Sequence, residues 1–509
     1  MSKYNTAAQM RSRFANTTNV GGGSSFKVTD AKKELAGVVL NSMLNGDSFY
    51  QKEGSRTDQV FNLINQASKS ERDARFAQKA MVYTRQVGNL RSVSHLMANA
   101  LAENSKGTSG LRAAIRQTIV RPDDMTEMAS LWFSRHPGVM LPNSMRRAFK
   151  DKLESGCWDA YQLNKYKGNN KRVKLTDIIQ LAHPKDTKNL FGRLLNDDLY
   201  APETLETKLA KGTSAAHSFA ELLVENRLGY MAAVKNIRNA LESGLSTYHL
   251  NKWAELITNT NRIRKSRMLP FRYVDAWLAV KDLNVDHFKL EIVKEAFNTA
   301  ITISAINLDI GNATERLAII LDESTSMGGR DYSYYNRDKL VEGPWKKAIT
   351  LAATLYTAYP SNKVVVYKFG STCTKLDFSG KKPLDIILNT QFGGGSTLFE
   401  KPLELLTKSE TYVDRIIMFT DMQLYGNQWG GRPIHAKNFD YYYTEYRKHV
   451  SPKVKFLFWN LEGHSSSTPL ELNDKILFAS GYSDRMLSVI PKIWDNPNAL
   501  IEEIESVDL

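Results

Sequence analysis

Cysteine is scarce in this chain of 509 residues, and long apolar runs are absent. The two cysteines, Cys157 and Cys373, stand far apart and lack metal-ligand spacing, which favours a reducing compartment over a disulfide framework. The amino terminus lacks the apolar segment of a signal peptide, and no run of about 18 apolar residues is present to span a bilayer. We therefore expect a soluble cytoplasmic protein with no membrane partner.

Catalytic signatures are missing as well. The sequence contains no Walker loop, no cluster of cysteine and histidine at metal-ligand spacing, and no pairing of a nucleophile with a base. We therefore expect a binding protein rather than an enzyme.

The formal net charge of +14 is distributed unevenly. Residues 312–509 hold 23 of the 68 basic and 24 of the 54 acidic residues, so residues 1–311 carry 45 basic residues against 30 acidic ones. Such asymmetry is typical of a surface that binds nucleic acid or an anionic membrane, although a merely soluble basic surface gives the same count.

The chain divides into three parts by pattern. Residues 1–27 are polar and glycine-rich, which indicates a flexible arm. Across residues 28–311, apolar residues recur at i, i+3, i+4 and i+7 in many segments separated by short turn signals, which predicts an irregular α-solenoid. Across residues 312–509, near-continuous apolar strands alternate with helical stretches, which predicts a doubly wound α/β domain with a parallel sheet.

Oxygen-bearing side chains follow two of the predicted strands. Asp322, Ser324 and Ser326 come after the strand over residues 316–321, and Asp421 comes after the strand over residues 415–420. Thr397 follows a run of three glycines between them. In doubly wound sheets the ligand site lies at the carboxyl ends of the strands, and Mg²⁺ prefers oxygen ligands, so we expect a Mg²⁺ site. An ordinary N-cap and turn is the alternative interpretation of the Asp and Ser residues.

The helical part contains three clusters of basic residues. Residues 165–174, which we call the basic loop, hold several cations around the aromatic Tyr166 and could neutralise phosphates while a base stacks on the ring. A solvated loop between helices is the alternative. The candidate RNA-binding residues are Lys165, Lys167, Lys171 and Arg172 of the basic loop, His183, Arg112 and Arg116, and Arg264, Lys265 and Arg267.

The motifs resemble two known families. Asp-x-Ser-x-Ser from Asp322, with a distant threonine and a distant aspartate, resembles the metal-ion-dependent adhesion site of von Willebrand factor A domains. The order of a Lys-Tyr-Lys loop, a helix ending in Leu-x-His at His183, a Leu-Pro-Phe helix entry at residues 269–271 and this metal motif resembles the Ro autoantigen family of TROVE-domain proteins. The second resemblance extends over roughly residues 28–505.

The Ro resemblance implies a fold and a set of partners. Members of this family form a ring of HEAT-like helical repeats closed by the A domain. Small noncoding Y RNA binds the basic outer face, 3′ ends of misfolded RNA enter the central hole, and an exoribonuclease can be tethered by the RNA. Carried over by motif, Lys165, Lys167 and His183 would contact Y RNA, while Lys171 and Arg172 supply charge.

Two functions follow as expectations. The first is an RNA-binding scaffold that acts in noncoding RNA quality control or decay. The alternative is a protein-interaction module that grips an acidic partner through the metal site of the A domain.

Overall fold

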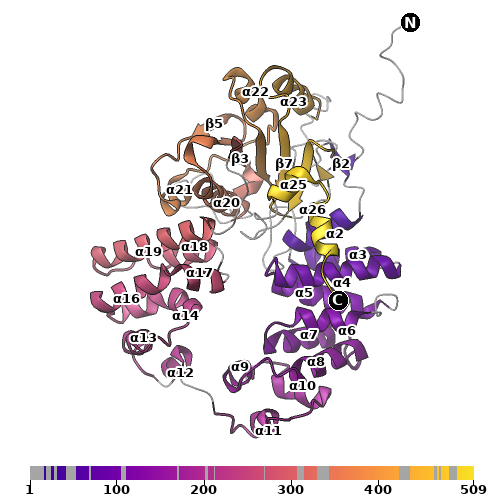
Figure 1. Cartoon of the computed structure of the whole chain (residues 1–509), viewed down its shortest axis with the longest axis vertical. Coiled ribbons are helices and arrows are strands. Elements are labelled where there is room, and N and C mark those ends of the chain that lie inside the picture. The colour runs from indigo at the N-terminus through magenta and orange to yellow at the C-terminus, as the bar shows by residue number, and fades with distance from the viewer. Residues whose placement is uncertain are drawn as a thin grey trace. The chain divides into compact units, whose positions relative to one another are not determined.

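The computed structural model describes residues 17–18, 24–27, 31–41, 53–67, 70–104, 110–168, 171–200, 204–210, 212–266, 268, 270–306, 314–328, 343–423, 436–462, 467–468, 472–480 and 490–509 (Figure 1). The chain forms two compact units. We call residues 29–47, 51–203 and 498–509 the helical unit, and residues 1–28, 48–50 and 204–497 the sheet unit.

The helical unit stacks short helices in layers, as an α-solenoid does. Helix α4 packs on α5 and α6, α5 packs on α7, and α6 packs on α8. In α4 the apolar residues Phe76, Ala77, Ala80 and Met81 are buried at helical spacing, and Ser70 caps the helix by accepting a 3.2 Å hydrogen bond from the backbone of Asp73. The helices are α2 (Ala31–Asn41), α3 (Glu53–Ala67), α4 (Glu71–Gln86), α5 (Arg91–Glu103), α6 (Leu111–Thr118), α7 (Pro122–Arg135), α8 (Asn143–Glu154), α9 (Ala160–Lys165), α10 (Leu175–Ala182), α11 (Leu190–Leu195) and α26 (Ala499–Glu505).

The end of the chain returns to this unit. Helix α26 packs on α2 and α4, where Tyr83 donates a 2.7 Å hydrogen bond to Glu503 and Lys32 pairs with Glu505. The sequence pattern placed these last residues with the α/β part, so this packing is a feature of the tertiary structure.

In the sheet unit, a series of helices precedes the strands of the six-stranded sheet along the chain. Trp253 is fully buried, donates to the carbonyl of Ala233 at 3.0 Å and lies 5.4 Å from the ring of Phe297. Apolar residues recur at helical spacing across residues 231–241, but the helix is interrupted at Asn236, whose side-chain amide donates to the carbonyl of Ala232. These helices are α12 (Leu205–Ala210), α13 (Ala215–Val224), α14 (Tyr230–Lys235), α15 (Ile237–Glu242), α16 (Thr247–Ile257), α17 (Thr260–Ser266), α18 (Pro270–Leu278) and α19 (His287–Ile306).

A mixed six-stranded sheet lies in the same unit, in the order β5-β4-β3-β6-β7-β9. Five strands are parallel, and β5 pairs antiparallel with β4 at one edge. The expected α/β layout is confirmed, but the prediction of a wholly parallel sheet is wrong at this edge, because a short turn after β4 leads directly into a hairpin. The strands are β3 (Leu317–Asp322), β4 (Val364–Phe369), β5 (Cys373–Leu376), β6 (Arg415–Thr420), β7 (Lys455–Asn460) and β9 (Ile476–Ser480).

Helices cover both faces of the sheet (Figure 1). Ala318 and Ile320 of β3 join a core with Phe399, Leu403 and Tyr446, which belong to or flank two helices, α22 (Glu400–Lys408) and α23 (Ala436–His449). Helix α20 (Pro344–Ala358) packs on β3 and β6, and α21 (Pro383–Asn389) packs on α20. Every residue of β3 is buried, which explains why both faces need a helical cover.

The predicted boundary near residue 312 falls inside the sheet unit. Helix α19 packs on α20 and α21, where Lys294 pairs with Asp385 at 2.9 Å and the backbone of Leu384 donates to Asn298 at 2.9 Å. The boundary therefore marks a change of secondary structure within one compact unit.

The described residues of the predicted arm form two short strands, β1 (Thr17–Thr18) and β2 (Ser24–Lys27). Strand β2 also pairs with β8 (Ser467–Thr468). Helix α25 (Ile490–Asp495) completes the described sheet unit. In the part of the chain that the structure describes, no helix is long and apolar enough to cross a membrane.

Candidate nucleic-acid interface and metal centre

The predicted metal ligands gather where β3 and β6 end. These strands are parallel neighbours. After β3 the chain adds β4 on one side of it, and it later adds β6 on the other side. The carboxyl ends of β3 and β6 therefore form the topological switch point of the sheet. Leu321 pairs with Phe419, which places Asp322 beside Thr420 and Asp421. The hydroxyl of Thr420 donates a 2.6 Å hydrogen bond to Asp322 Oδ2.

A single 3₁₀ turn over residues 325–328 brings two serines to the same place. The backbone N–H of Ser324 donates to Asp322 Oδ1 at 2.8 Å, and the hydroxyls of Ser324 and Ser326 are 3.3 Å apart. The hydroxyl of Ser326 is also hydrogen-bonded to Asp421. Four of the five predicted ligands therefore meet within one hydrogen-bonded cluster.

The two aspartates are buried and repel one another. Burial raises the pKa of Asp322 above its ordinary value, and the charge of Glu323 adds to this, although hydrogen bonds from Thr420 and Ser324 act in the opposite direction. Burial and the charge of Asp322 raise the pKa of Asp421. A divalent cation would offset both effects, and two carboxylates with hydroxyl oxygens suit Mg²⁺.

The fifth predicted ligand, Thr397, is buried in the loop that approaches this turn. The backbone N–H of Thr325 donates to the carbonyl of Gly395 at 3.0 Å, and the N–H of Gly395 donates to the Thr325 hydroxyl at 3.1 Å. Among the described residues, no group of three or more His, Cys, Asp and Glu side chains could hold a metal ion. The predicted site depends instead on two carboxylates and three hydroxyls.

Glu323 supports this loop, and the sequence pattern gave it no role. Its carboxylate is buried, accepts from Lys368 Nζ at 2.9 Å and accepts from the backbone of Gly393 at 2.8 Å. A Cβ atom at Gly393 would lie 2.7 Å from Glu323 Oε2, which explains the glycine. Two features of the sequence could have indicated this role of Glu323: an acidic residue at the end of a buried strand, and a lysine within β4.

The basic loop joins α9 to α10, and two backbone hydrogen bonds close it. Leu175 N–H donates to the carbonyl of Lys167 at 3.0 Å, and Lys171 N–H donates to the carbonyl of Gly168 at 2.9 Å. Gly168 has a φ of 79°, in the region that glycine adopts without strain. Residues 169 and 170 lie outside the described part of the chain.

The cations of the basic loop differ in accessibility. Lys165, Lys171 and Arg172 are exposed, whereas the side chain of Lys167 is 13% exposed and pairs with Asp197. Lys167 is therefore not the open surface cation that the pattern indicated. Its carboxylate partner lies 30 residues further along the chain, which sequence spacing does not reveal.

The other predicted RNA-binding residues are spread over both units. His183 is exposed at the end of α10, about 12 Å along that helix from the basic loop. Arg112 makes two 2.6 Å hydrogen bonds to Asp151, and Arg116 is exposed on the same helix. Arg264 and Lys265 are exposed on α17 in the sheet unit, and Arg267 lies outside the described residues.

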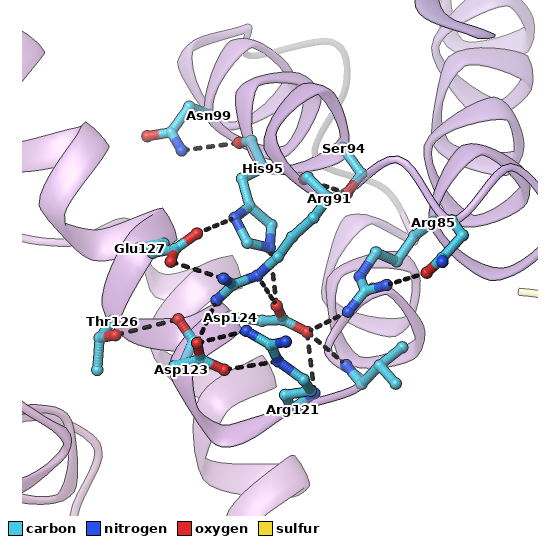
Figure 2. Close-up of polar contacts among 12 residues, drawn as sticks. Arg85, Arg91, Ser94, His95, Asn99, Arg121, Asp123, Asp124, Thr126 and Glu127 are labelled. Atoms are coloured by element: carbon cyan, nitrogen blue, oxygen red, sulfur yellow. Dashed lines mark hydrogen bonds and ion pairs between the residues drawn. The ribbon is translucent and has the colours of Figure 1, made fainter. Parts of the chain in front are cut away.

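A network of charged side chains, some of them buried, joins neighbouring helices of the helical unit, and the sequence pattern did not identify it (Figure 2). Residues of α4, α5 and α7, together with the residue before α7, form what we call the ionic network. Its members are Arg85, Arg91, His95, Arg121, Asp123, Asp124 and Glu127.

Asp124 is the centre of the ionic network. Its fully buried carboxylate is 3.1 Å from Arg85 Nη2, 2.6 Å from Arg91 Nε and 3.3 Å from His95 Nε2. Burial opposes ionisation, but hydrogen bonding and charge from His95, the charge of Arg85 and the backbone N–H of Arg121 outweigh it, so the pKa of Asp124 lies well below its ordinary value. The carboxylate stays ionised and holds three helices together.

Comparison with known proteins supports the resemblance. The TROVE domain model matches residues 192–318. Telomerase protein component 1 of Rattus norvegicus is 31% identical over 78 residues, which are 15% of this chain and 3% of that protein, so the chain spans only a small part of this relative. The crystal structure of the Deinococcus radiodurans Ro (RSR) protein matches with a TM-score of 0.60 at 15% identity, covering 91% of this chain and all of that chain. Residues 192–318 therefore match the TROVE domain model, within a chain whose fold is similar to that of a Ro protein.

Proposed function

We propose that this protein is an RNA-binding scaffold whose basic loop and neighbouring helices hold small, structured Y-like noncoding RNA. Members of the TROVE family resembled by the sequence bind such RNA, and the Ro-like fold supports the same role here. In this role the protein takes part in noncoding RNA quality control or decay, receives 3′ ends of misfolded RNA and works with an exoribonuclease tethered by the RNA.

One observation carries the proposal. Lys165, Lys171 and Arg172 are exposed on one short loop that two backbone hydrogen bonds hold in shape. Closely spaced exposed cations neutralise neighbouring phosphates and release counterions, which is the main source of affinity for nucleic acid. The side chain of Lys171 is 47% exposed while its Nζ lies 3.6 Å from Glu127 Oε1, so its ammonium group can meet a phosphate without leaving Glu127.

The dependence of affinity on salt tests the proposal. Binding of a labelled stem–loop RNA is measured by fluorescence anisotropy at several salt concentrations. We expect affinity to fall steeply, with a slope of about −0.9 per neutralised phosphate in a plot of log affinity against log salt. An affinity that stays constant between low and high salt would contradict RNA binding by a basic surface.

A second role, as a metal-dependent protein-interaction module, is supported by the cluster around Asp322. Asp322, Ser324, Ser326, Thr397 and Asp421 would hold Mg²⁺, and the ion would accept an acidic group of a partner protein. Loss of partner binding on addition of a chelator, with RNA binding unchanged, would separate this role from the first.

A further inference from the structure

Two contacts join the basic loop to the ionic network. The guanidinium carbon of Arg121 lies 5.0 Å from the centre of the Tyr166 ring, and Lys171 Nζ lies 3.6 Å from Glu127 Oε1. Tyr166 comes before Gly168 in the loop and Lys171 comes after it, so the described residues on each side of Gly168 have their own attachment. These contacts add to the backbone hydrogen bonds that close the loop.

Arg121 is itself held in a fixed orientation. Its Nε and Nη2 atoms donate to the two carboxylate oxygens of Asp123 at 2.9 and 2.6 Å. Asp123 is buried, and its carboxylate is also 2.8 Å from Arg91 Nη2. A guanidinium bound at two points cannot turn freely, so its flat face is a fixed support for the ring of Tyr166. A lysine could supply the charge but not this plane.

Glu127 is fixed in a similar way. One carboxylate oxygen lies 2.7 Å from Arg91 Nη1 and the other lies 3.4 Å from His95 Nδ1. The side chain of His95 is buried, and Arg91 is anchored to Asp124. The acceptor that faces Lys171 therefore belongs to the ionic network and not to a mobile surface side chain.

We propose that Arg121 and Glu127 are positioning residues that transmit the rigidity of the ionic network to the basic loop. The inference rests on the proposed RNA-binding function, because the loop is the surface that would meet phosphate. A loop fixed before RNA arrives loses less conformational entropy on binding, which raises affinity without an additional contact to the RNA. Tyr166, backed by Arg121 on one face, keeps its ring in place for a base to stack on the other.

Arg121→Lys tests this role, because it keeps the charge and removes the flat two-point contact. Amide hydrogen exchange of Lys171 and Leu175, measured in the full chain without RNA, reports the two bonds that close the loop. We expect exchange of both amides to be roughly threefold to tenfold faster and RNA affinity to fall by a similar factor, because stacking and hydrogen bonding are weakened. The salt slope of RNA affinity should not change, because the number of cations is the same.

Two further variants sharpen the test. Glu127→Gln should speed exchange of the Lys171 amide, and it keeps the proposal falsifiable if Arg121→Lys does not fold. Arg238→Lys disrupts a comparable interaction, the 3.1 Å hydrogen bond of Arg238 to Glu242 in the sheet unit, and should leave loop exchange and RNA affinity unchanged.

A double-mutant cycle separates positioning from a general loss of stability. If Arg121 acts through Tyr166, then Tyr166→Leu and Arg121→Lys together should weaken RNA binding less than the sum of the two single effects. Additive effects would overturn the proposal.

Two other results would also overturn it. One is exchange at the wild-type rate in both Arg121→Lys and Glu127→Gln. The other is weaker RNA binding by Arg121→Lys with unchanged exchange, which would make Arg121 a direct RNA contact. If the wild-type protein binds no RNA, the proposed function fails, while the exchange measurement still decides whether the ionic network fixes the loop.

Discussion

Thr420 donates a 2.6 Å hydrogen bond to Asp322, and this bond joins the ends of two neighbouring strands that are 98 residues apart in the sequence. Both side chains are fully buried, and Asp421 follows Thr420 directly. The bond fixes the orientation of Asp322. The nearby carboxylate of Asp421 raises the electrostatic cost of keeping Asp322 and Asp421 ionised together. This relationship makes the end of the sheet a place where a cation would be strongly stabilising.

Magnesium should therefore raise the thermal stability of the wild-type protein. At a free Mg²⁺ concentration 100 times the dissociation constant, the expected gain is about 2.7 kcal/mol. Above about pH 8, where both carboxylates are ionised, Asp421→Asn should raise the melting temperature without metal, because it removes the repulsion with Asp322, and it should abolish the response to Mg²⁺. Calorimetry with and without a chelator measures both effects, and an unchanged Mg²⁺ response in the variant would contradict the site.

Replacing Lys165, Lys167, Lys171 and Arg172 together with alanine should weaken RNA binding and reduce its salt slope by about 1 for each phosphate that is no longer neutralised. The exposed residues should account for most of the effect, because Lys167 is already paired with Asp197. A matched control removes four exposed lysines of the sheet unit, Lys375, Lys381, Lys382 and Lys408. An equal decrease in affinity in both quadruple variants would show that total charge, and not the basic loop, determines binding.

Asp124→Asn should destabilise the protein by about 3 kcal/mol, because it leaves the buried guanidinium of Arg85 without its carboxylate and removes one of the three carboxylates that pair with Arg91. The pKa of Asp124 is depressed in the folded state, so its contribution to stability is complete above the unfolded pKa of about 4 and is lost as the pH falls below that value. On acidification, the free energy of unfolding of Asp124→Asn should therefore decrease less than that of the wild-type protein. Urea unfolding followed by circular dichroism at neutral and acidic pH measures this, and identical pH profiles would rule out the assignment.

Gly370→Ala should destabilise the protein by roughly 1–3 kcal/mol, because its Cβ atom would lie 2.9 Å from the backbone carbonyl of Gly394 in the loop that carries Thr397. Gly229→Ala is the matched control, since nothing lies within 4 Å of the added Cβ atom. The control should be neutral or slightly stabilising in the same urea titration. Similar decreases in stability in both variants would show that the close contact with the carbonyl of Gly394 does not cause the loss of stability in Gly370→Ala.

Sequence pattern was most informative where burial follows a local period. Apolar residues recur at helical spacing across residues 71–86, where the structure has helix α4, and strands β3 and β6 lie within one residue of their predicted positions. The pattern failed at Asn236, where one side chain bonds to the backbone and ends a helix, and at the hairpin strand β5, which is short and half-exposed. In both places a local interaction or an edge position outweighs hydrophobic periodicity.

The sequence by itself determined which oxygen-bearing side chains follow the strands. It also determined that these side chains lie near one another, because the carboxyl ends of neighbouring parallel strands meet at one edge of a sheet. Only the tertiary structure decided which cations stay accessible. Lys167 and Arg112 acquire carboxylate partners 30 and 39 residues away, and Glu323 reaches Gly393 across 70 residues. Ion pairs and loop supports depend on distances through space between segments, and packing sets those distances.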